Sequence, residues 1–335
     1  MKTRKPVLTD IAREAGVSIA TASRAMNEPG LVQAETLRKV REVMARLGYT
    51  PNRKARALAS GRSQTIGVVV PTVNSAIFAQ CLQAMQRVLY ADGYLLLVAS
   101  HEYDPVNETM AVSQLISHGV DGLILVGAAR PDATWRLIDD AGLPVVQLWA
   151  GRPDRDRVVV DNHAAGGMIA RHLIDFGHRD FAVICGHLQE NDRQRARLAG
   201  VRDALADAGM SLDAGRVIEA GLSIGSGREA CRALLELRQR PTAVLGLVDL
   251  LAVGAIYEVQ RAGLEVPRDI SVAGIDNAEF SVHIAPSLTT VSIPAARIGQ
   301  MAAQRMVAIL SGDAEPRETT LDIALVRRQS TGPHA

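Results

Sequence analysis

Residues 12–24 read AREAGVSIATASR, and this stretch decides the architecture of the N-terminal part of the chain. Gly16 predicts a tight turn, because a residue without a Cβ adopts positive φ at little cost. Ser18 is a favourable N-cap for a helix that follows the turn. Ala22 and Ala25 are small enough to let this second helix cross an earlier one closely. This spacing of small residues, glycine turn and capped helix is typical of a helix-turn-helix.

Three helices in all are expected in this N-terminal head. The first covers about residues 8–15. The second begins after its N-cap, Ser18, and runs to about residue 27. A third covers about residues 34–47, where apolar residues recur at helical spacing and Gly48 ends the helix. We therefore expect a small all-α domain over residues 1–50.

The charge of the chain is distributed unevenly between the head and the rest. Residues 1–62 contain 13 Lys/Arg and 5 Asp/Glu, a balance of +8, and the remaining residues contain 24 and 31, a balance of −7. A basic module attached to an acidic body indicates a polyanion-binding head.

The second helix of the head is the expected DNA-reading element. If it enters the major groove, its first residues meet base edges and phosphates. Arg24 is suited to a bidentate contact with guanine, and Ile19 and Ala20 offer apolar contacts to a thymine methyl. Contacts to phosphate are the expected role of Thr21 and Ser23. The other residues of the head that are predicted to contact DNA are Thr9, Ser18 and Asn27.

A short, basic and helix-prone segment, PNRKARALA over residues 51–59, follows the head. Together with Gly48-Tyr49-x-Pro51-Asn52 and the helix-turn-helix motif, it resembles the LacI/GalR (lac repressor) family. The resemblance implies a hinge helix over residues 51–62 that folds on operator binding and kinks the DNA with an inserted leucine. By that likeness Leu58 is the wedge, Ala55 packs beside it, and the remaining hinge contacts to the backbone come from Asn52, Arg53 and Arg56.

Beyond residue 63 short apolar runs alternate with helical segments. Strands are expected at residues 66–70, 94–99, 122–126, 145–148, 158–160, 181–185, 243–247 and 270–273. Helices are expected at residues 77–92, 106–118, 164–176, 192–208 and 250–262. This alternation predicts an α/β body of two parallel sheets, with a break near residues 152–157 and a return to the first lobe near the end. Residues 63–335 would then form a two-lobed effector-binding and dimerisation domain.

The body also resembles the same family, through motifs at residues 119–124, 161–162, 177–179, 197–200 and 274–276. The resemblance implies a periplasmic-binding-protein-like body whose cleft holds a small effector. Ligand groups gather at the carboxyl ends of parallel strands, and the candidates there in the first lobe are Asn74, Phe78, Ser100, Tyr103 and Trp149. In the second lobe, the positions that match the family's cleft groups are Asp161, Arg197, Asp249 and Asp276.

The chemistry of these candidates suits a sugar, a polyol or a sugar acid. Carboxylates accept hydrogen bonds from hydroxyl groups, and an arginine forks to adjacent oxygens. Alternatively, Asp161 and Asp276 cap helices and Arg197 pairs with an aspartate between the lobes. The chain departs from many sugar-binding relatives at Leu222, where they have an aromatic platform, and at Ile293, a polar cleft position elsewhere. These departures argue against a stacked hexose, and His101 with several arginines leaves room for a sugar acid.

Other classes of protein fit the sequence less well. Residues 221–227 superficially resemble a phosphate loop, but their glycine spacing matches no nucleotide-binding motif, and we expect neither an enzyme nor a cofactor or metal site. Cys81, Cys185 and Cys231 are scattered and form no disulfide framework. The N-terminus lacks a signal-peptide pattern and no long apolar run follows, so the expected location is the cytoplasm. A solute-binding protein of a transport system is the alternative that matches the body alone.

The predicted partners are double-stranded DNA, a small effector and a second copy of the chain. One head reads half a site, so we expect a homodimer on a near-palindromic operator. Met85, Val88 and Leu89 on the helix at 77–92 are the candidate dimer surface. No heptad repeat follows residues 326–330, which favours a dimer over a tetramer. Effector binding is expected to move the lobes and so change the spacing of the hinge segments.

Overall fold

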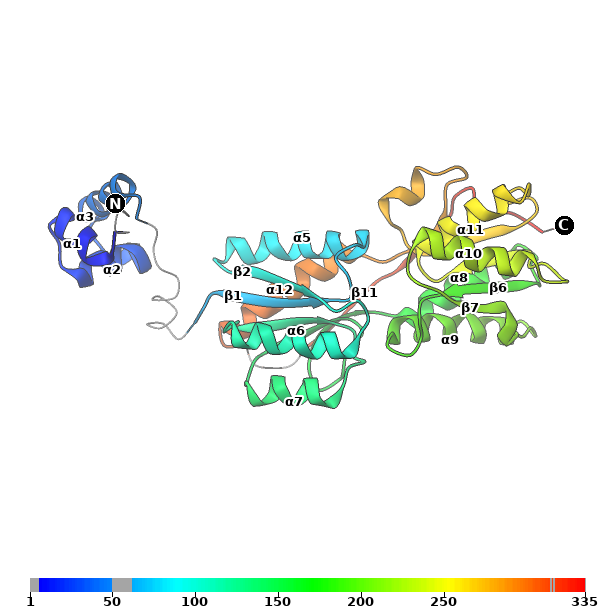
Figure 1. The fold of residues 1–335 in the computed structure, drawn as a ribbon, viewed down its shortest axis with the longest axis horizontal. Coiled ribbons are helices and arrows are strands. Elements are labelled where there is room, and N and C mark those ends of the chain that lie inside the picture. The colour runs from blue at the N-terminus through cyan, green and yellow to red at the C-terminus, as the bar shows by residue number, and fades with distance from the viewer. Residues whose placement is uncertain (1–5, 50–61, 314, 316, 335) are drawn as a thin grey trace. The chain divides into compact units, whose positions relative to one another are not determined.

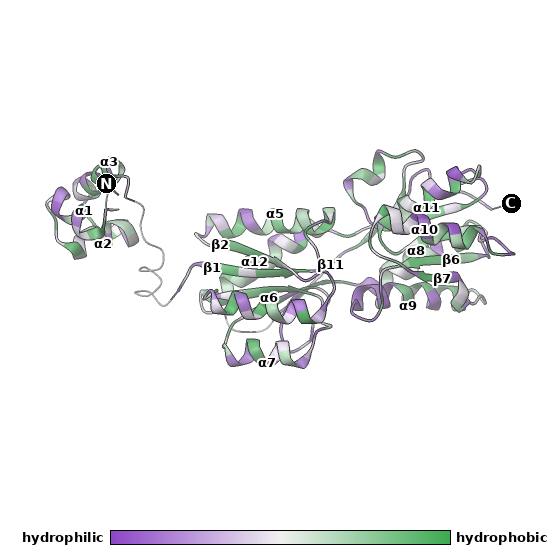
Figure 2. Ribbon diagram, in the orientation of Figure 1, coloured by the Kyte–Doolittle hydropathy of each residue, from purple (hydrophilic) through white to green (hydrophobic). Residues whose placement is uncertain are grey.

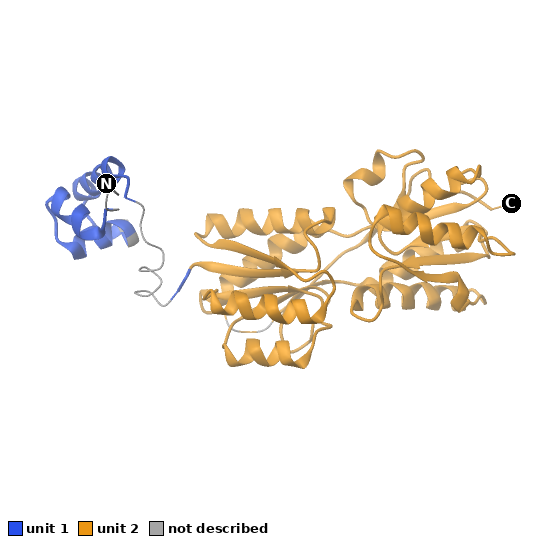
Figure 3. Cartoon of the chain, in the orientation of Figure 1, with its two compact units in different colours: residues 1–63 blue, residues 64–335 orange. Residues whose placement is uncertain are grey.

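The structure is a computed structural model that describes residues 6–49, 62–313, 315 and 317–334, including all their side chains except those of Asn27 and Pro29. The chain divides into two compact units, residues 1–63 and 64–335 (Figure 3). The hinge positions expected at Asn52, Arg53, Ala55, Arg56 and Leu58 lie outside the described residues. Within the described ranges, no helix combines the length and apolar character that crossing a bilayer requires.

The N-terminal unit contains the three helices that the sequence predicts. They are α1 (Leu8–Ala15), α2 (Ile19–Asn27) and α3 (Ala34–Leu47), with a 3-10 turn, η1 (Pro29–Leu31), that was not predicted. Gly16 has φ of 66° and closes α1, while the Ser18 side chain accepts a hydrogen bond from the Thr21 N–H at 3.0 Å. A core of Ile11, Ala25, Val40 and Val43 holds the helices together.

The first lobe of the second unit is built on one parallel sheet. Its strands, in spatial order, are β11 (Glu318–Leu321), β5 (Asp156–Val160), β4 (Val145–Trp149), β3 (Gly122–Val126), β1 (Thr65–Val70) and β2 (Leu95–Ser100). Figure 1 shows the helices on its two faces: α5 (Ala76–Ala91) with α12 (Ala295–Leu310), and α6 (Pro105–Ser117) with α7 (Asp132–Asp140). Alternate residues of β1 face opposite ways, so Val68 packs with α5 and Val69 packs with α6.

The second lobe repeats this architecture around another sheet. Its strands, in spatial order, are β12 (Ala324–Val326), β10 (Thr289–Ser292), β9 (Ser271–Asp276), β8 (Ala243–Gly246), β6 (Phe181–Cys185) and β7 (Val217–Glu219). All pairs are parallel except β10 with β12, which is antiparallel. The helical elements are α8 (Asn162–Asp175), α9 (Asp192–Asp207), α10 (Ile224–Leu235), α11 (Asp249–Arg261), η2 (Ala214–Arg216) and η3 (Glu279–Val282). In Figure 2 the strands of both lobes are largely hydrophobic, as expected for sheets covered on two faces.

The chain crosses between the lobes at three places. The expected break at residues 152–157 is wrong, because Asp156 begins β5, which pairs with β4, and the chain leaves the first lobe only after Val160. The predicted late return is confirmed: α12 packs against α5, and β11 joins the first sheet before β12 re-enters the second. Residues 221–227, the segment that superficially resembles a phosphate loop, contain the N-cap Ser223 and the first turn of α10.

The predicted dimer surface on α5 needs correction. Met85 and Leu89 are fully buried and belong to the core beneath α5, because α12 packs against this face of the helix. Val88 is half-buried against the same core. The exposed apolar side chains of this region are instead Tyr90, Leu95 and Val98, at the end of α5 and along the edge strand β2.

Candidate functional site

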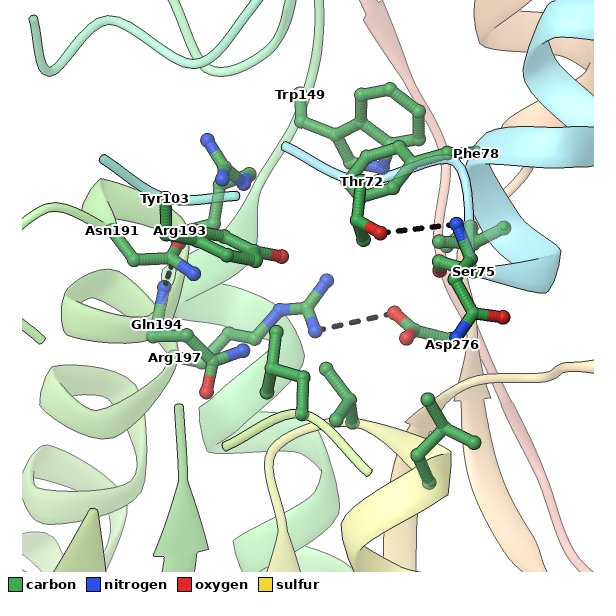
Figure 4. A pocket seen from close by; sticks show the side chains of 15 residues that line it. Thr72, Ser75, Phe78, Tyr103, Trp149, Asn191, Arg193, Gln194, Arg197 and Asp276 are labelled. Atoms are coloured by element: carbon green, nitrogen blue, oxygen red, sulfur yellow. Dashed lines mark hydrogen bonds and ion pairs between the residues drawn. The ribbon is translucent and has the colours of Figure 1, made fainter. Parts of the chain in front are cut away.

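A pocket with a volume of about 550 Å³, counting the part open to solvent, lies where the carboxyl ends of strands from both lobes meet (Figure 4). The first lobe lines it with Thr72, Asn74, Ser75, Ile77, Phe78, Tyr103 and Trp149. The second lobe lines it with Asn191, Arg193, Gln194, Arg197, Leu222, Val248, Leu250 and Asp276. All the ionisable acid and arginine side chains of the lining therefore come from the second lobe.

The first-lobe wall is formed by the first turn of α5, the last residue of β4 and loop residues after β1 and β2. The Phe78 and Trp149 rings meet edge-to-face, with centroids 5.2 Å apart, and make one apolar side of the pocket. Thr72 holds the turn before α5, because its hydroxyl accepts the Asn74 N–H at 3.0 Å. The hydroxyl of Tyr103 points into the pocket in Figure 4.

Arg197 on α9 is the centre of the second-lobe wall and is 3% exposed. Its Nε donates to the Asn162 Oδ1 at 3.0 Å, and its Nη1 donates to the Leu247 carbonyl at 2.7 Å and to Asp276 Oδ1 at 3.2 Å. The guanidinium thus ties α9 to the start of α8 and to the ends of β8 and β9. Asn162 continues this network by donating to the Trp149 carbonyl at 3.0 Å.

A close helix crossing places Arg197 in this position. A Cβ on Gly166 of α8 would lie 1.9 Å from the Arg197 carbonyl oxygen, and a Cβ on Gly200 of α9 would lie 1.9 Å from the His163 carbonyl oxygen. Only glycine at both positions allows the two backbones to approach so closely.

Two buried carboxyl groups lie behind and beside Arg197. Burial raises the pKa of Asp276 to about 6, although Arg197 acts in the opposite direction. Burial, and then the charge of Asp276, raise the pKa of Asp249 to about 7. Asp249 accepts hydrogen bonds from the Thr290 hydroxyl at 2.5 Å and from the Ala278 N–H at 2.8 Å. It therefore supports the loop that carries Asp276.

Asp192, at the start of α9, joins the second lobe to the first beside the pocket. Its Oδ2 accepts the N–H groups of Ala128 and Ala129, at 2.6 and 3.2 Å, and its Oδ1 accepts Nη1 of Arg193 at 2.9 Å. Burial alone would raise the pKa of Asp192, but Arg193 and these N–H groups hold that pKa below its usual value. Gly127 has φ of 78°, and a Cβ there would meet Arg193 Nη1 at 2.2 Å, so the first-lobe loop is shaped to receive this pair.

Three of the lining residues have backbone conformations that side chains rarely adopt. The φ angles are 63° for Tyr103, 62° for Trp149 and 133° for Asp276. Such strain persists only where the surrounding structure imposes it, and it gathers at ligand sites. Its presence on both walls supports a binding role for the pocket.

The structure brings six of the nine predicted effector residues into this pocket. These are Asn74, Phe78, Tyr103, Trp149, Arg197 and Asp276. Asp161 instead caps α8 by accepting the Ala164 N–H at 2.8 Å, which is the alternative that the sequence left open. Ser100 is exposed at the end of the edge strand β2, and Asp249 is buried behind the wall. Arg197 pairs with Asp276 of its own lobe, and it also lines the pocket.

Sequence reasoning missed Arg193, Asn191 and Gln194. All three lie at the start of α9, as Asn191 is its N-cap and Arg193 precedes Arg197 by one helical turn. The i, i+4 spacing of the two arginines was the available signal. Leu222 lines the pocket, whereas Ile293 is buried in the core and lies outside the lining.

On the head, α2 presents both apolar and polar side chains to solvent. Ile19 is 52% exposed, Ala20 and Arg24 are also exposed, and Thr21 and Ser23 are half-buried. Thr9 and Ser18 are exposed as well, although the Ser18 hydroxyl is engaged as the N-cap. The Asn27 side chain lies outside the described structure.

Comparison with known proteins gives the identity of both parts of the chain. Residues 7–52 match the family described as bacterial regulatory proteins, lacI family, and residues 170–331 match a periplasmic binding protein-like domain. The HTH-type transcriptional regulator DegA of Bacillus subtilis (strain 168) is 33% identical over 98% of this chain and 99% of its own length. The chain belongs to the lacI family of bacterial regulatory proteins.

Solved structures of transcription regulators share the fold. The lac repressor dimer bound to operator and the anti-inducer ONPF is 29% identical, with a TM-score of 0.88 over 98% of this chain and 100% of that one. The transcriptional regulator CelR in complex with cellobiose is 29% identical, with a TM-score of 0.74 over 97% of this chain and 99% of that one. As a lacI-family member the protein is a DNA-binding transcription regulator and not an enzyme. The head decides against a transport solute-binding protein.

Proposed function

We propose that the protein is a repressor that binds a near-palindromic operator as a homodimer and whose operator affinity changes when a small polar effector fills the pocket. The observation that carries this proposal is the pocket itself, where the Arg197–Asp276 pair joins α9 to the end of β9 and lines the pocket with the first-lobe aromatic residues. The known lac repressor dimer on its operator and the cellobiose complex of CelR support it by likeness. A ligand that contacts both lobes favours the lobe arrangement in which it binds best.

The head would read DNA through the exposed face of α2. Ile19, Ala20 and Arg24 are placed for base edges, because they are exposed within the first two turns of the helix. Thr9, Ser18, Thr21 and Ser23 are suited to phosphate contacts. Contacts by Asn27 and by the hinge residues Asn52, Arg53, Ala55, Arg56 and Leu58 remain predictions from the sequence.

A dimer contact fits the exposed apolar edge of the first lobe. Tyr90 is 81% exposed, and Leu95 and Val98 lie exposed on β2, which is the edge strand of its sheet. Val106 and Met110 add an exposed apolar pair one turn apart on α6. Apolar edge strands are normally covered. Light scattering is expected to show two subunits, and Val98→Glu is expected to weaken the association.

Operator selection tests the proposal directly. The full-length protein is incubated with random DNA duplexes, and retained duplexes are sequenced over several rounds. The expected result is an enriched inverted repeat, bound with an affinity that falls steeply as salt increases. Recovery of no common sequence would contradict sequence-specific binding.

A matched pair of head variants locates the reading surface. Arg24→Gln removes an exposed cation from α2 and is expected to lose about 1–3 kcal/mol of operator binding, with relaxed specificity at one base pair. Arg38→Gln removes an exposed cation from α3 that pairs with Glu42, and it is expected to retain specificity. Equal losses in both variants would point to charge alone and not to base reading by α2.

A further inference from the structure

The pocket lining carries more positive than negative side chains. Arg193 and Arg197, which are 8% and 3% exposed, line it together with a single carboxyl group, that of Asp276. Charged side chains this deeply buried require partners, because each loses its hydration. The question is therefore whether the protein itself supplies all the partners.

Arg197 retains a donor for a ligand. Its Nε and Nη1 are bonded to Asn162, Leu247 and Asp276, but among the described residues no acceptor bonds its Nη2. In Figure 4 the Arg197 guanidinium points into the pocket. A planar guanidinium with a free edge is the side chain best suited to a carboxylate.

Arg193 is only partly neutralised. Its carboxylate partner is Asp192, which also accepts hydrogen bonds from three backbone N–H groups, those of Ala128, Ala129 and Arg193 itself. The negative charge of Asp192 is shared among these donors and not reserved for the guanidinium. The Arg193 side chain therefore adds positive potential to the pocket that it lines.

Three helix starts add to this potential. The N-caps of α5, α9 and α11 are Ser75, Asn191 and Val248, and all three residues line the pocket. The side chains of Ser75 and Val248 make no capping hydrogen bond, so the first-turn N–H groups of α5 and α11 are not satisfied by their own caps. Helix N-termini favour a negative group.

The other polar side chains of the lining suit hydroxyl groups. Asp276, Asn74 and the hydroxyls of Thr72 and Tyr103 offer acceptors and donors around the cavity. The second lobe contributes Leu222, Val248 and Leu250 as its apolar residues, and none of these is aromatic.

From this arrangement we infer that the effector is a polyhydroxylated carboxylic acid of monosaccharide size, with its carboxylate bound by Arg197 and Arg193 and its hydroxyls bound by Asp276 and the first-lobe wall. The inference rests on the proposed function, because it assigns the chemical class of the effector of that same pocket. Neutral sugars lack the group that would pair with the two arginines.

Calorimetric titration of the full-length protein with matched ligands tests the inference. The probes are sodium gluconate, galactonate, glucuronate and galacturonate, each compared with the neutral aldose and alditol of the same carbon skeleton, and with glucose 6-phosphate. Sodium chloride at equal concentration controls for ionic strength. At least one acid is expected to bind about tenfold or more tightly than its neutral counterparts.

Two variants on the same helix identify the responsible charge. Arg193→Gln is expected to weaken acid binding by about tenfold and to leave the weak binding of the neutral counterpart nearly unchanged. The matched control is Arg195→Gln, because Arg195 is exposed, bonds the Leu188 and Gln189 carbonyls and lies outside the lining. It is expected to bind the acid normally. Unchanged circular dichroism and urea-unfolding midpoints of both variants show that they fold.

Three results would overturn the inference. A neutral sugar that binds as tightly as its acid, a response to the phosphate ester alone, or no binding by any acid would each rule out a carboxylate effector. A neutral sugar that alters operator affinity would at the same time leave the proposed function intact. Failure of operator selection, in contrast, would contradict the proposed function whatever the pocket binds.

Discussion

The first-lobe wall of the pocket carries no charged side chain, whereas the second-lobe wall carries Arg193, Arg197 and Asp276 on α9 and at the end of β9. The Phe78 and Trp149 rings close the cavity by shape. Arg197 and Asp276 are held by a network of hydrogen bonds behind a helix crossing that only glycines permit. The difference indicates that the second lobe selects the ligand by charge and direction, and that the first lobe covers it.

The largest effect is expected from Gly200→Ala, which disrupts the crossing of α8 and α9 that supports the second-lobe wall. The added Cβ would lie 1.9 Å from the His163 carbonyl oxygen, so α8 and α9 must separate, at an expected loss of more than about 3 kcal/mol of stability. Urea unfolding followed by circular dichroism measures it. The control is Gly225→Ala at the start of α10, where the nearest side-chain atom is 3.8 Å away and little change is expected. Equal stability of the two variants would show that the crossing does not need glycine.

Arg197→Met is expected to lose about 3 kcal/mol of stability near neutral pH, since it leaves Asp276 and Asn162 without their buried partner. The loss should shrink near pH 5, because the pKa of Asp276, which burial raises to about 6, lets that carboxyl take up a proton. The exposed Arg195→Met is the control and should change stability by less than about 0.5 kcal/mol. A loss independent of pH would indicate that packing, and not the ion pair, stabilises this wall.

His178 gives the second lobe a predicted sensitivity to acid. It bonds Thr242, Ser271 and the Gly332 carbonyl, and burial lowers its pKa from 6.5 to about 4. The unfolded chain binds the proton first, so this contribution is fully present above pH 6.5 and is lost as the pH falls towards 4. Between pH 7.5 and pH 5 it amounts to about 2 kcal/mol.

The comparison of His178→Gln with the wild type isolates that contribution. The variant should be less stable at pH 7.5 and should lose about 2 kcal/mol less than the wild type between pH 7.5 and pH 5. His118→Gln, at the exposed end of α6, should keep the wild-type pH dependence. Parallel pH curves for His178→Gln and the wild type would contradict the assignment.

The smallest effect is expected at the first-lobe wall. Phe78→Leu removes the edge contact with Trp149 and should lose about 1 kcal/mol, because an apolar side chain of similar volume still fills the site. Both tryptophans, Trp135 and Trp149, lie in the first lobe, so fluorescence reports this change directly. Gln83→Ala on the exposed side of α5 is the control. A loss as large as that of Arg197→Met would remove the contrast between the walls.

Much of the architecture followed from local pattern. The turn at Gly16, the cap at Ser18 and the αL residue Gly48 set the helix boundaries of the head, because each acts within one helical turn. In the body the buried strands were recognisable as short apolar runs between helices. The break between the lobes was placed too early, because nothing local in residues 156–160 shows that they pair with β4.

The residues of the candidate site were likewise predicted only in part from the sequence. Motif likeness led to Arg197 and Asp276, and strand ends led to Phe78 and Trp149, all of which line the pocket. Ser100 and Asp161 also follow or precede regular elements, but their side chains are directed to solvent or to a cap. Position at a strand end therefore does not suffice for a place in the lining.

The sequence by itself determined the helix-turn-helix head, the alternation of strands and helices and the family, because these depend on local spacing and on motifs in order. Only the tertiary structure decided that Met85 and Leu89 are core residues, since α12 arrives from more than 200 residues further along the chain to cover them. It alone placed Arg193 and Arg197 opposite the first-lobe wall of the pocket and Asp192 against the first lobe. Such contacts join residues far apart in the chain, and no periodicity within a segment encodes which distant element will lie opposite it.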